Sequence, residues 1–256
     1  MMGGKFEYIM SDTAGNAERL AFVYRNDKVI PTNLFGELAL RPREYPKRTV
    51  KVRWTDANGI DRIDKFANHK FVPFDRNPFI GSFSSGNFDF VLANVHLYFG
   101  KFQNSKKKEE REKYARRVLE IHALARWAGR RKDKAATYDK DIILIGDMNV
   151  PSMSATESTY KELVKYGWQP ADYTTKTGGS NLGNDKTYDQ MAFAPTIPNT
   201  RIIDLGVFDF DKAVFKPLWE KLLKKMSKSK AIGLFNRHMK HHISDHRPLW
   251  VELDVT

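Results

Sequence analysis

Short runs of apolar and β-branched residues recur along the chain and predict its strands. Two of these runs, residues 91–95 and 142–145, are almost entirely apolar. Such runs are typical of strands that are buried on both faces in the middle of a covered sheet. The predicted strands are Leu20–Arg25, Thr49–Trp54, Phe88–Leu97, Asp141–Gly146, Tyr188–Ala194, Ile202–Phe208 and Leu249–Leu253.

Helical periodicity appears between these runs. Apolar side chains recur at steps of four, three, four and three residues from Tyr114 to Ala128, so a basic amphipathic helix is predicted from a cap at Ser105 to about Gly129. Its Tyr114, Val118 and Ile121 are expected to face the sheet, with Lys106, Lys107, Lys108 and Arg111 mostly exposed. Two further helices are predicted, one after Ser154 that stops at Gly167 and one over Ala213–Met226.

Alternating strands and long connections indicate a layered α/β or α+β architecture. With no internal repeat and no Pro- or Ser-rich linker, residues 1–256 are interpreted as a single domain. An apolar fraction of 41% with 12% aromatics is typical of folded globular proteins.

The absence of cysteine limits the chemistry. It excludes disulfides, thiolate zinc sites and cysteine nucleophiles, so that a metal must be held by oxygen or imidazole. No run is long enough to span a membrane, and residues 1–10 lack a signal-type apolar run. We therefore expect no membrane partner and a cytoplasmic location by default. A signal peptide could lie upstream if the chain is a fragment.

Charge is distributed unevenly. The net charge of +12 divides into +3 for residues 1–100, +8 for 101–140, −5 for 141–211 and +6 for 212–256. Basic segments on either side of an acidic middle suit a protein that attracts a polyanion while keeping carboxylates for chemistry. A solvated basic surface without a partner is the alternative.

Candidate chemistry first appears where the second apolar run ends. The sequence Gly146-Asp147-Met148-Asn149 places Asp147 and Asn149 at the mouth of a central strand, where ligands bind in open sheets. Residues two apart point to the same side of a strand, so the carboxylate and the amide could act on one phosphate, nucleophile or ion. An Asx turn that leaves the strand is the alternative.

A second motif, Ser244-Asp245-His246, precedes the final strand. It offers an oxygen ligand for a cation beside an imidazole that can exchange a proton. Both side chains would need a local bend to reach one site. A strand-initiating turn with His246 in the core is the alternative.

Polar residues inside other predicted strands require partners or a function. Asn94 and His96 lie in one such strand and Asp189 in another, and a His–Asp pair would make a general base. Glu18 and Arg76 are weaker candidates. The cluster of His238, His241 and His242 shows no spacing that would converge three rings on a metal.

The order of these pieces resembles the endonuclease/exonuclease/phosphatase superfamily, which includes deoxyribonuclease I. Gly-Asp-x-Asn and Ser-Asp-His-x-Pro are specific matches within a resemblance that runs from about Ser11 to Glu252. The sequence around these motifs is most similar to the uncharacterised bacterial branch of that family. The resemblance implies a four-layer α/β sandwich of two packed mixed sheets flanked by helices, with phosphoester hydrolysis assisted by Mg²⁺, Mn²⁺ or Ca²⁺.

The same resemblance implies roles for the individual residues. His246 would be the general base and Asp189 its orienting partner, while His96, paired with Glu18, would lie near the leaving oxygen. Asp147 and Asn149 would position the nucleophile and the phosphate, and both could join Asp245 as metal ligands. Substrate contacts are expected from Arg76, Asn94, Lys106, Lys107, Lys108 and Arg111.

The chain departs from the family at its N-terminal side. The family begins with an Asn strand and a Gln-Glu motif that supplies the main metal ligand; neither is present, and Glu7 does not fit that context. We therefore expect an N-terminally incomplete fold with exposed strand edges and apolar surface. We also expect weak Mg²⁺ binding and slow cleavage.

Three functions follow for comparison. The first is a metal-dependent phosphodiesterase, of the DNase-like endonuclease type, with nucleic acid as partner and DNA favoured over RNA. The second is a catalytically weak module that still binds nucleic acid. The third is a phosphatase or lipid phosphodiesterase of the same fold. For the first, Asp147, Asn149, Asp189 and His246 should converge within roughly 5–8 Å.

Overall fold

The computed structural model describes residues 5–12, 15, 17–45, 47–68, 74–99, 105–132, 134, 137–210 and 213–256. The strands are β1 (Phe6–Met10), β2 (Ala21–Arg25), β3 (Ile30–Glu37), β4 (Arg48–Thr55), β5 (Asp61–Asn68), β6 (Phe79–Ser85), β7 (Phe88–His96), β8 (Ile142–Asp147), β9 (Gln169–Pro170), β10 (Asp189–Phe193), β11 (Ile202–Val207) and β12 (Leu249–Leu253). The helices are α1 (Lys108–Lys132), α2 (Ser158–Val164), α3 (Thr174–Thr177), α4 (Lys216–Lys225) and α5 (Lys228–His242), with short 3₁₀ turns at Pro42–Glu44 and Asn199–Arg201.

A mixed six-stranded sheet forms the centre of the molecule, with the strand order β3-β6-β7-β8-β10-β9. β7 and β8 are parallel and are joined by the long crossover helix α1, whereas the other described neighbours are antiparallel. The two apolar runs thus occupy the middle of the sheet, as the sequence predicts. The chain that leaves β7 is bound to the middle of α1, since the backbone N–H of Tyr98 donates to Glu120 Oε2.

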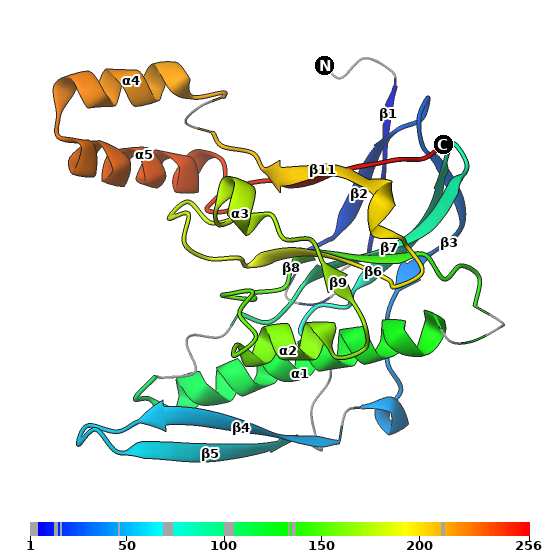
Figure 1. The fold of residues 1–256 in the computed structure, drawn as a ribbon, viewed down its shortest axis with the longest axis horizontal. Helices are drawn as coiled ribbons and strands as arrows, with labels where there is room; N and C mark the ends of the chain where they lie inside the picture. The colour runs from blue at the N-terminus through cyan, green and yellow to red at the C-terminus, as the bar shows by residue number, and fades with distance from the viewer. Residues whose placement is uncertain are drawn as a thin grey trace.

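Helices α1 and α2 cover one face of this sheet (Figure 1). Val91, Val95 and Leu144 of the central strands pack there against Ile121 and Leu124 of α1, and all five side chains are buried. Ile121 therefore faces the sheet as predicted. Burial of large aliphatic side chains, each worth about 1.5–3 kcal/mol, stabilises the contact between the helix and the sheet.

The opposite face of the sheet carries two separate antiparallel pairs, β1–β2 and β11–β12. Phe22 of β2 packs on Phe79 and Phe83, while Leu205 of β11 and Val251 of β12 pack in the cluster around Phe193. The α/β class with packed sheets is confirmed. The second layer of the predicted sandwich consists of these two pairs.

Apolar surface is exposed around the β1–β2 pair, as expected from the sequence. Tyr8 and Val23 are 68% and 63% exposed. A groove of about 590 Å³ runs beside β2 and is lined by Phe22, Phe90 and Ile145. This groove lies on the same face as β11–β12.

The hairpin β4–β5 lies against the outer side of α1 (Figure 1). Its position contradicts two predictions made from the sequence. Tyr114 and Val118 pack against Val50 and Val52 of this hairpin, so they do not face the six-stranded sheet. Arg111, expected to be exposed, is buried. The periodicity of the helix does not reveal that a hairpin covers this side of it.

Helices α4 and α5 form a hairpin at one side of the molecule (Figure 1). Phe235 and Met239 of α5 are buried together with Phe210, and Trp219 of α4 packs against Phe235 with ring centroids 5.5 Å apart. The predicted helix over Ala213–Met226 corresponds to α4, whereas α5 was not predicted. In the described part of the chain, no helix has the length and apolar character required to cross a membrane.

Candidate active site

The registers of three neighbouring strands bring polar side chains together at one sheet edge. His96, the last residue of β7, pairs in parallel register with Asp147, the last residue of β8. Asp189, the first residue of β10, lies opposite the same Asp147 in antiparallel register. His246 joins them from the loop before β12, through an isolated bridge between Asn181 and His246.

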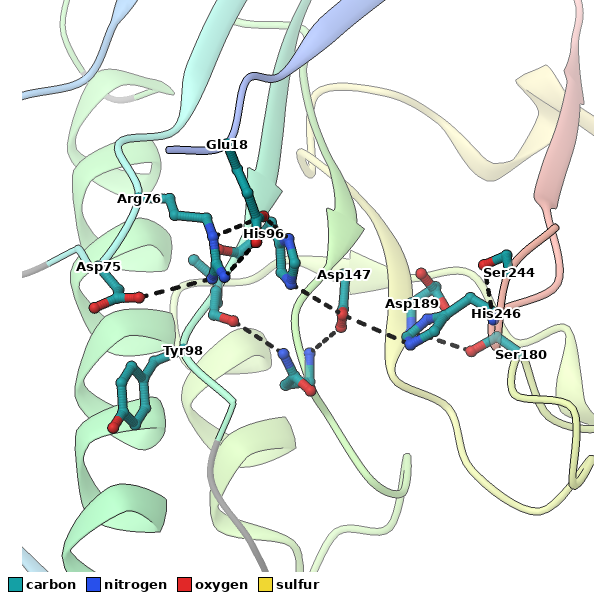
Figure 2. Close-up of polar contacts among 12 residues, drawn as sticks. Glu18, Asp75, Arg76, His96, Tyr98, Asp147, Ser180, Asp189, Ser244 and His246 are labelled. Carbon is teal, nitrogen blue, oxygen red and sulfur yellow. Dashed lines mark hydrogen bonds and ion pairs between the residues drawn. The ribbon is translucent and has the colours of Figure 1, made fainter. Parts of the chain in front are cut away.

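These side chains form a row in which carboxylates and imidazoles alternate (Figure 2). Glu18 Oε2 lies 2.7 Å from His96 Nδ1, and His96 Nε2 lies 3.6 Å from Asp147 Oδ2. On the other side, His246 Nε2 lies 3.8 Å from Asp147 Oδ2, while His246 Nδ1 lies 2.8 Å from Asp189 Oδ2. Both rings thus use Nδ1 for a carboxylate partner and present Nε2 to Asp147.

Gly146 permits the approach of β8 to β7 at this point. Its φ is +121°, in the region that favours glycine, and a Cβ there would lie 2.1 Å from the carbonyl oxygen of Val95. A side chain at position 146 would therefore push apart the strand ends that carry His96 and Asp147. The close approach of the two strands therefore explains why the Gly-Asp-x-Asn motif begins with glycine.

Asn149 supports Asp147 and is itself buried. Its backbone N–H donates to Asp147 Oδ1 at 2.9 Å, and its side-chain Nδ2 donates to the carbonyl of Leu97 at 2.9 Å. The Asx-type bond that was the alternative interpretation is thus present, and it fixes the carboxylate. In this structure the side-chain amide nitrogen of Asn149 is therefore hydrogen-bonded to the backbone just after β7.

Arg76 does not project towards a substrate. It is 8% exposed, and its Nε and Nη2 lie 2.8 Å from the two carboxylate oxygens of Glu18. Its Nη1 donates to the carbonyl of His96. The expected contact with a backbone phosphate is replaced by a bidentate pair that holds Glu18 against the ring of His96.

Asp245, predicted as a metal ligand, lies outside this row. Its Oδ2 accepts from Lys240 Nζ of α5 at 3.0 Å, whereas the backbone of Asp245 joins Leu182. The backbone N–H of His246 donates to Ser244 Oγ at 3.0 Å. Consecutive side chains therefore diverge here, and only His246 turns towards Asp147.

The electrostatics follow from this crowding of like and unlike charges. Burial and the nearby Asp189 carboxylate raise the pKa of Asp147. The hydrogen bond that His246 Nδ1 donates to the Asp189 carboxylate raises the pKa of His246 to about 9 against the opposing effect of burial. Desolvation acts to raise the pKa of Glu18, but Arg76 and His96 leave it lowered overall. The carboxylate of Glu18 at one end of the row therefore keeps its negative charge.

The residues present fit a divalent cation. Among the described residues, Asp147, Asp189 and His246 form the one cluster of three metal-ligating side chains, with ligand atoms within 4.8 Å of one another. Carboxylates are the preferred protein ligands of Mg²⁺ and Mn²⁺. A cation would also relieve the repulsion that raises the pKa of Asp147.

The predicted substrate contacts have different positions. Lys106, Lys107 and Lys108 are exposed at the start of α1, close in sequence to the end of β7. Asn94 donates Nδ2 to the carbonyl of Ala21 and ties β7 to the strand β2. Arg111 is wrong as a substrate contact, because its guanidinium binds Asp64 at 2.7 Å and stacks on Trp54 at 3.8 Å from the ring centroid.

Sequence reasoning missed two parts of the site. Ser180 is buried, and its Oγ accepts from the backbone N–H of Asp189 at 3.1 Å. Tyr188 lies with its ring centroid 5.9 Å from that of His246. Its position next to Asp189 in the sequence was the available signal.

No protein-family model matches the chain, and no curated protein matches its sequence. Several solved structures are similar. NExo, a 3′ phosphatase from Neisseria bound to a product DNA hairpin, aligns with a TM-score of 0.49 at 11% identity, over 98% of this chain and 80% of its own. A mannosyl-6-phosphatase from Bacteroides thetaiotaomicron aligns with a TM-score of 0.45 at 16% identity, over 80% of this chain and 67% of its own.

An endonuclease/exonuclease/phosphatase family protein from the same Bacteroides species aligns with a TM-score of 0.40 at 16% identity, over 80% of this chain and 64% of its own. This chain thus spans about two thirds of the length of the two Bacteroides proteins. The family printed for the second of them is the one that the sequence motifs resemble. The chain is thus similar to a solved structure of a protein from that family.

Proposed function

We propose that the protein is a metal-dependent phosphodiester hydrolase that acts on nucleic acid, with DNA as the substrate. One observation carries the proposal: Asp147 lies between two imidazoles, each held by a carboxylate of its own. A partly buried carboxylate and the two oriented imidazoles beside it can exchange protons on both sides of a reacting phosphate.

The hydrolysis can be written for these side chains. Asp147 orients a water molecule and receives one of its protons as the water oxygen bonds to phosphorus. The bond from phosphorus to the leaving oxygen breaks, and His96, held by Glu18, supplies the proton that this oxygen needs. His246, held by Asp189, donates from Nε2 to a phosphate oxygen, and its raised pKa agrees with a ring that keeps its proton. This assignment moves the role of base from His246 to Asp147.

Asp147 and Asp189 are the side chains that would hold a divalent cation, because both ring nitrogens of His246 are engaged in the step above. Such a cation, when bound, supplies positive charge that stabilises the negative charge developing on the phosphate. The choice of a polyanionic substrate is supported by exposed basic residues, including Lys106–Lys108 at the start of α1.

The proposal is tested with plasmid DNA and a labelled duplex, each with Mg²⁺ and with EDTA. Cleavage should require the cation, and His246→Ala and His96→Ala should each lower the rate at least about 100-fold. His238→Ala is the matched control, because His238 is exposed on α5 outside the row. Cleavage that survives in EDTA, or His246→Ala and His238→Ala variants with equal rates, would contradict the proposal.

A further inference from the structure

A second pocket opens beside His246, on the side away from His96. Its volume is about 390 Å³, and its walls come from three parts of the chain. The loop at residues 181–183 forms one wall, α5 contributes Asn236, Arg237 and Lys240, and Tyr188 adjoins His246. The pocket therefore shares His246 with the row and extends from it towards α5.

The walls of this pocket are held in place by the fold. Phe235 and Met239 anchor α5 through its buried side, which leaves Arg237 and Lys240 on the exposed side of the same helix. Asn236 Nδ2 donates to the carbonyl of Leu182 at 3.4 Å. The backbone N–H of Leu182 in turn donates to the carbonyl of Asp245 at 3.1 Å. Loop, helix and catalytic motif are thus tied to one another.

The charge of the helical wall favours an anion. Residues 216–242, which cover α4 and α5, contain eight Lys or Arg residues and one acidic residue, Glu220. At the pocket, Lys240 is paired with Asp245, but these two side chains are 62% and 55% exposed. Such an exposed pair contributes little free energy and can exchange its partner for a phosphate at small cost. Arg237 adds a planar group suited to phosphate.

Tyr188 adds an apolar, planar surface next to this charge. Its ring is partly exposed and tilted 34° relative to the ring of His246. An aromatic face beside cationic side chains is the combination that binds a base together with its phosphate in single-stranded nucleic acids. The amide groups of Asn181 and Asn236 add polar character to the walls.

We propose that α5 and the loop at residues 181–183 form a nucleotide subsite next to the row, in which Arg237 and Lys240 bind the phosphate adjoining the scissile one and Tyr188 stacks on its base or sugar. This inference rests on the proposed function and names its substrate class, a polynucleotide with at least two phosphates. A substrate with a single phosphate, bound at the row for hydrolysis, would leave the subsite empty.

Binding is measured first, because it does not depend on turnover. The probe is a fluorescein-labelled 12-nucleotide single-stranded DNA, followed by anisotropy in EDTA at several salt concentrations. Arg237→Ala should raise Kd about 5- to 10-fold and reduce the salt slope by about one, as expected for the loss of one phosphate contact. Lys230→Ala is the control, since it removes the same charge from an exposed position of α5 outside the pocket. Its Kd should change less than about 2-fold.

Competition separates a nucleotide from a bare anion. Thymidine monophosphate should displace the labelled DNA at several-fold lower concentration than inorganic phosphate does. Equal displacement would overturn the stacking role of Tyr188. Equal Kd values for Arg237→Ala and Lys230→Ala would overturn the subsite as a whole. Thermal melts confirm that both variants are folded.

Catalysis then distinguishes the subsite from the proposed function. With Mg²⁺, Arg237→Ala should lower kcat/KM for the 12-nucleotide DNA about 10-fold more than kcat/KM for bis(p-nitrophenyl) phosphate, which has no second phosphate. If the unmodified protein hydrolyses both substrates and this ratio is unchanged, the subsite is wrong and the function stands. If the unmodified protein hydrolyses neither, the function is wrong, and the binding experiment still decides the subsite.

Discussion

Asp147 and Asp189 face each other across the antiparallel pair of β8 and β10. Burial and the nearby carboxylate of Asp189 raise the pKa of Asp147, while the hydrogen bond that His246 donates to Asp189 raises the pKa of His246. The pairing of β8 with β10, which places Asp189 opposite Asp147, therefore affects the pKa of both Asp147 and His246. This arrangement explains why two acids lie so close together in a row that also contains two imidazoles.

Replacing Asp189 with Asn should lower kcat about 10²- to 10⁴-fold, because the amide cannot stabilise the charged ring of His246 as a carboxylate does. KM should change little, since Asp189 acts through His246. Single-turnover cleavage of a labelled duplex provides the measurement. Asp27→Asn, in the turn between β2 and β3, is the matched control. An Asp189→Asn variant that retains the kcat of the unmodified protein would exclude the pairing as a positioning device.

Gly146→Ala should lower the free energy of unfolding by about 2–4 kcal/mol, since the alanine Cβ would meet the carbonyl of Val95 and the φ of +121° would be strained. Urea denaturation gives the value. Gly36→Ala in β3 is the control, because no atom lies within 4 Å of a Cβ there and its φ is ordinary. Equal stability of the two variants would mean that the close approach of β7 and β8 is not required.

The free energy of unfolding should depend on pH because of the buried carboxyl group of Glu120. Burial raises its pKa to about 8, although the backbone N–H groups of Tyr98 and Asp75 act to lower it. The unfolded chain releases this proton near pH 4.5 and the folded chain near pH 8, so this group lowers stability progressively as pH rises through that window.

Glu120→Gln cannot release a proton, and comparison with the unmodified protein isolates this effect. Between pH 5 and 8, the free energy of unfolding should fall by a few kcal/mol more in the unmodified protein than in Glu120→Gln. Denaturant titrations at four pH values measure the difference. Parallel curves for the two proteins would show that Glu120 is already ionised in the folded state.

Arg111→Ala should lower the free energy of unfolding by about 1–3 kcal/mol, because the guanidinium binds Asp64 and stacks on Trp54 between α1 and the hairpin β4–β5. DNA affinity should remain within about 2-fold. Lys113→Ala, an exposed position of the same helix, should leave stability nearly unchanged. A large loss of DNA affinity with unchanged stability would restore Arg111 as a substrate contact.

Charge reversal of Lys106, Lys107 and Lys108 should weaken DNA binding and flatten its salt dependence, because fewer counterions are released on binding. Anisotropy titrations at several salt concentrations give both quantities. The matched control reverses Lys51, Arg53 and Lys65, three exposed charges on the hairpin β4–β5. Equal effects from the two triple variants would show that net charge, and not the start of α1, determines affinity.

The central strands and the motifs at their ends were predictable from the sequence. Continuous apolar runs identify β7 and β8, and Asp147 and His96 follow at the points where those strands end. Of the four side chains predicted to converge, those of Asp147, Asp189 and His246 do so, with ligand atoms within 4.8 Å, whereas the side-chain amide of Asn149 binds the backbone of Leu97. Local patterns sufficed here because the strand register itself sets the distances.

Contacts between distant segments were not predictable. Arg111 has the periodicity of an exposed helical residue, and only the hairpin β4–β5 reverses that expectation. Asp245 has the sequence context of a metal ligand, yet Lys240 of an unpredicted helix binds its carboxylate. β3 was missed because Pro31 and Gly36 interrupt its pattern, and α5 because Gly233 and polar residues obscure its apolar side.

The most direct test of the account is single-turnover cleavage of a labelled DNA duplex by Asp147→Asn, compared with the unmodified protein in Mg²⁺. An asparagine side chain can still accept the hydrogen bond from the backbone N–H of Asn149, so the loop should persist. The account predicts that cleavage falls at least about 10³-fold while DNA binding is retained. Cleavage by Asp147→Asn at the rate of the unmodified protein would contradict the central role of the carboxylate between His96 and His246.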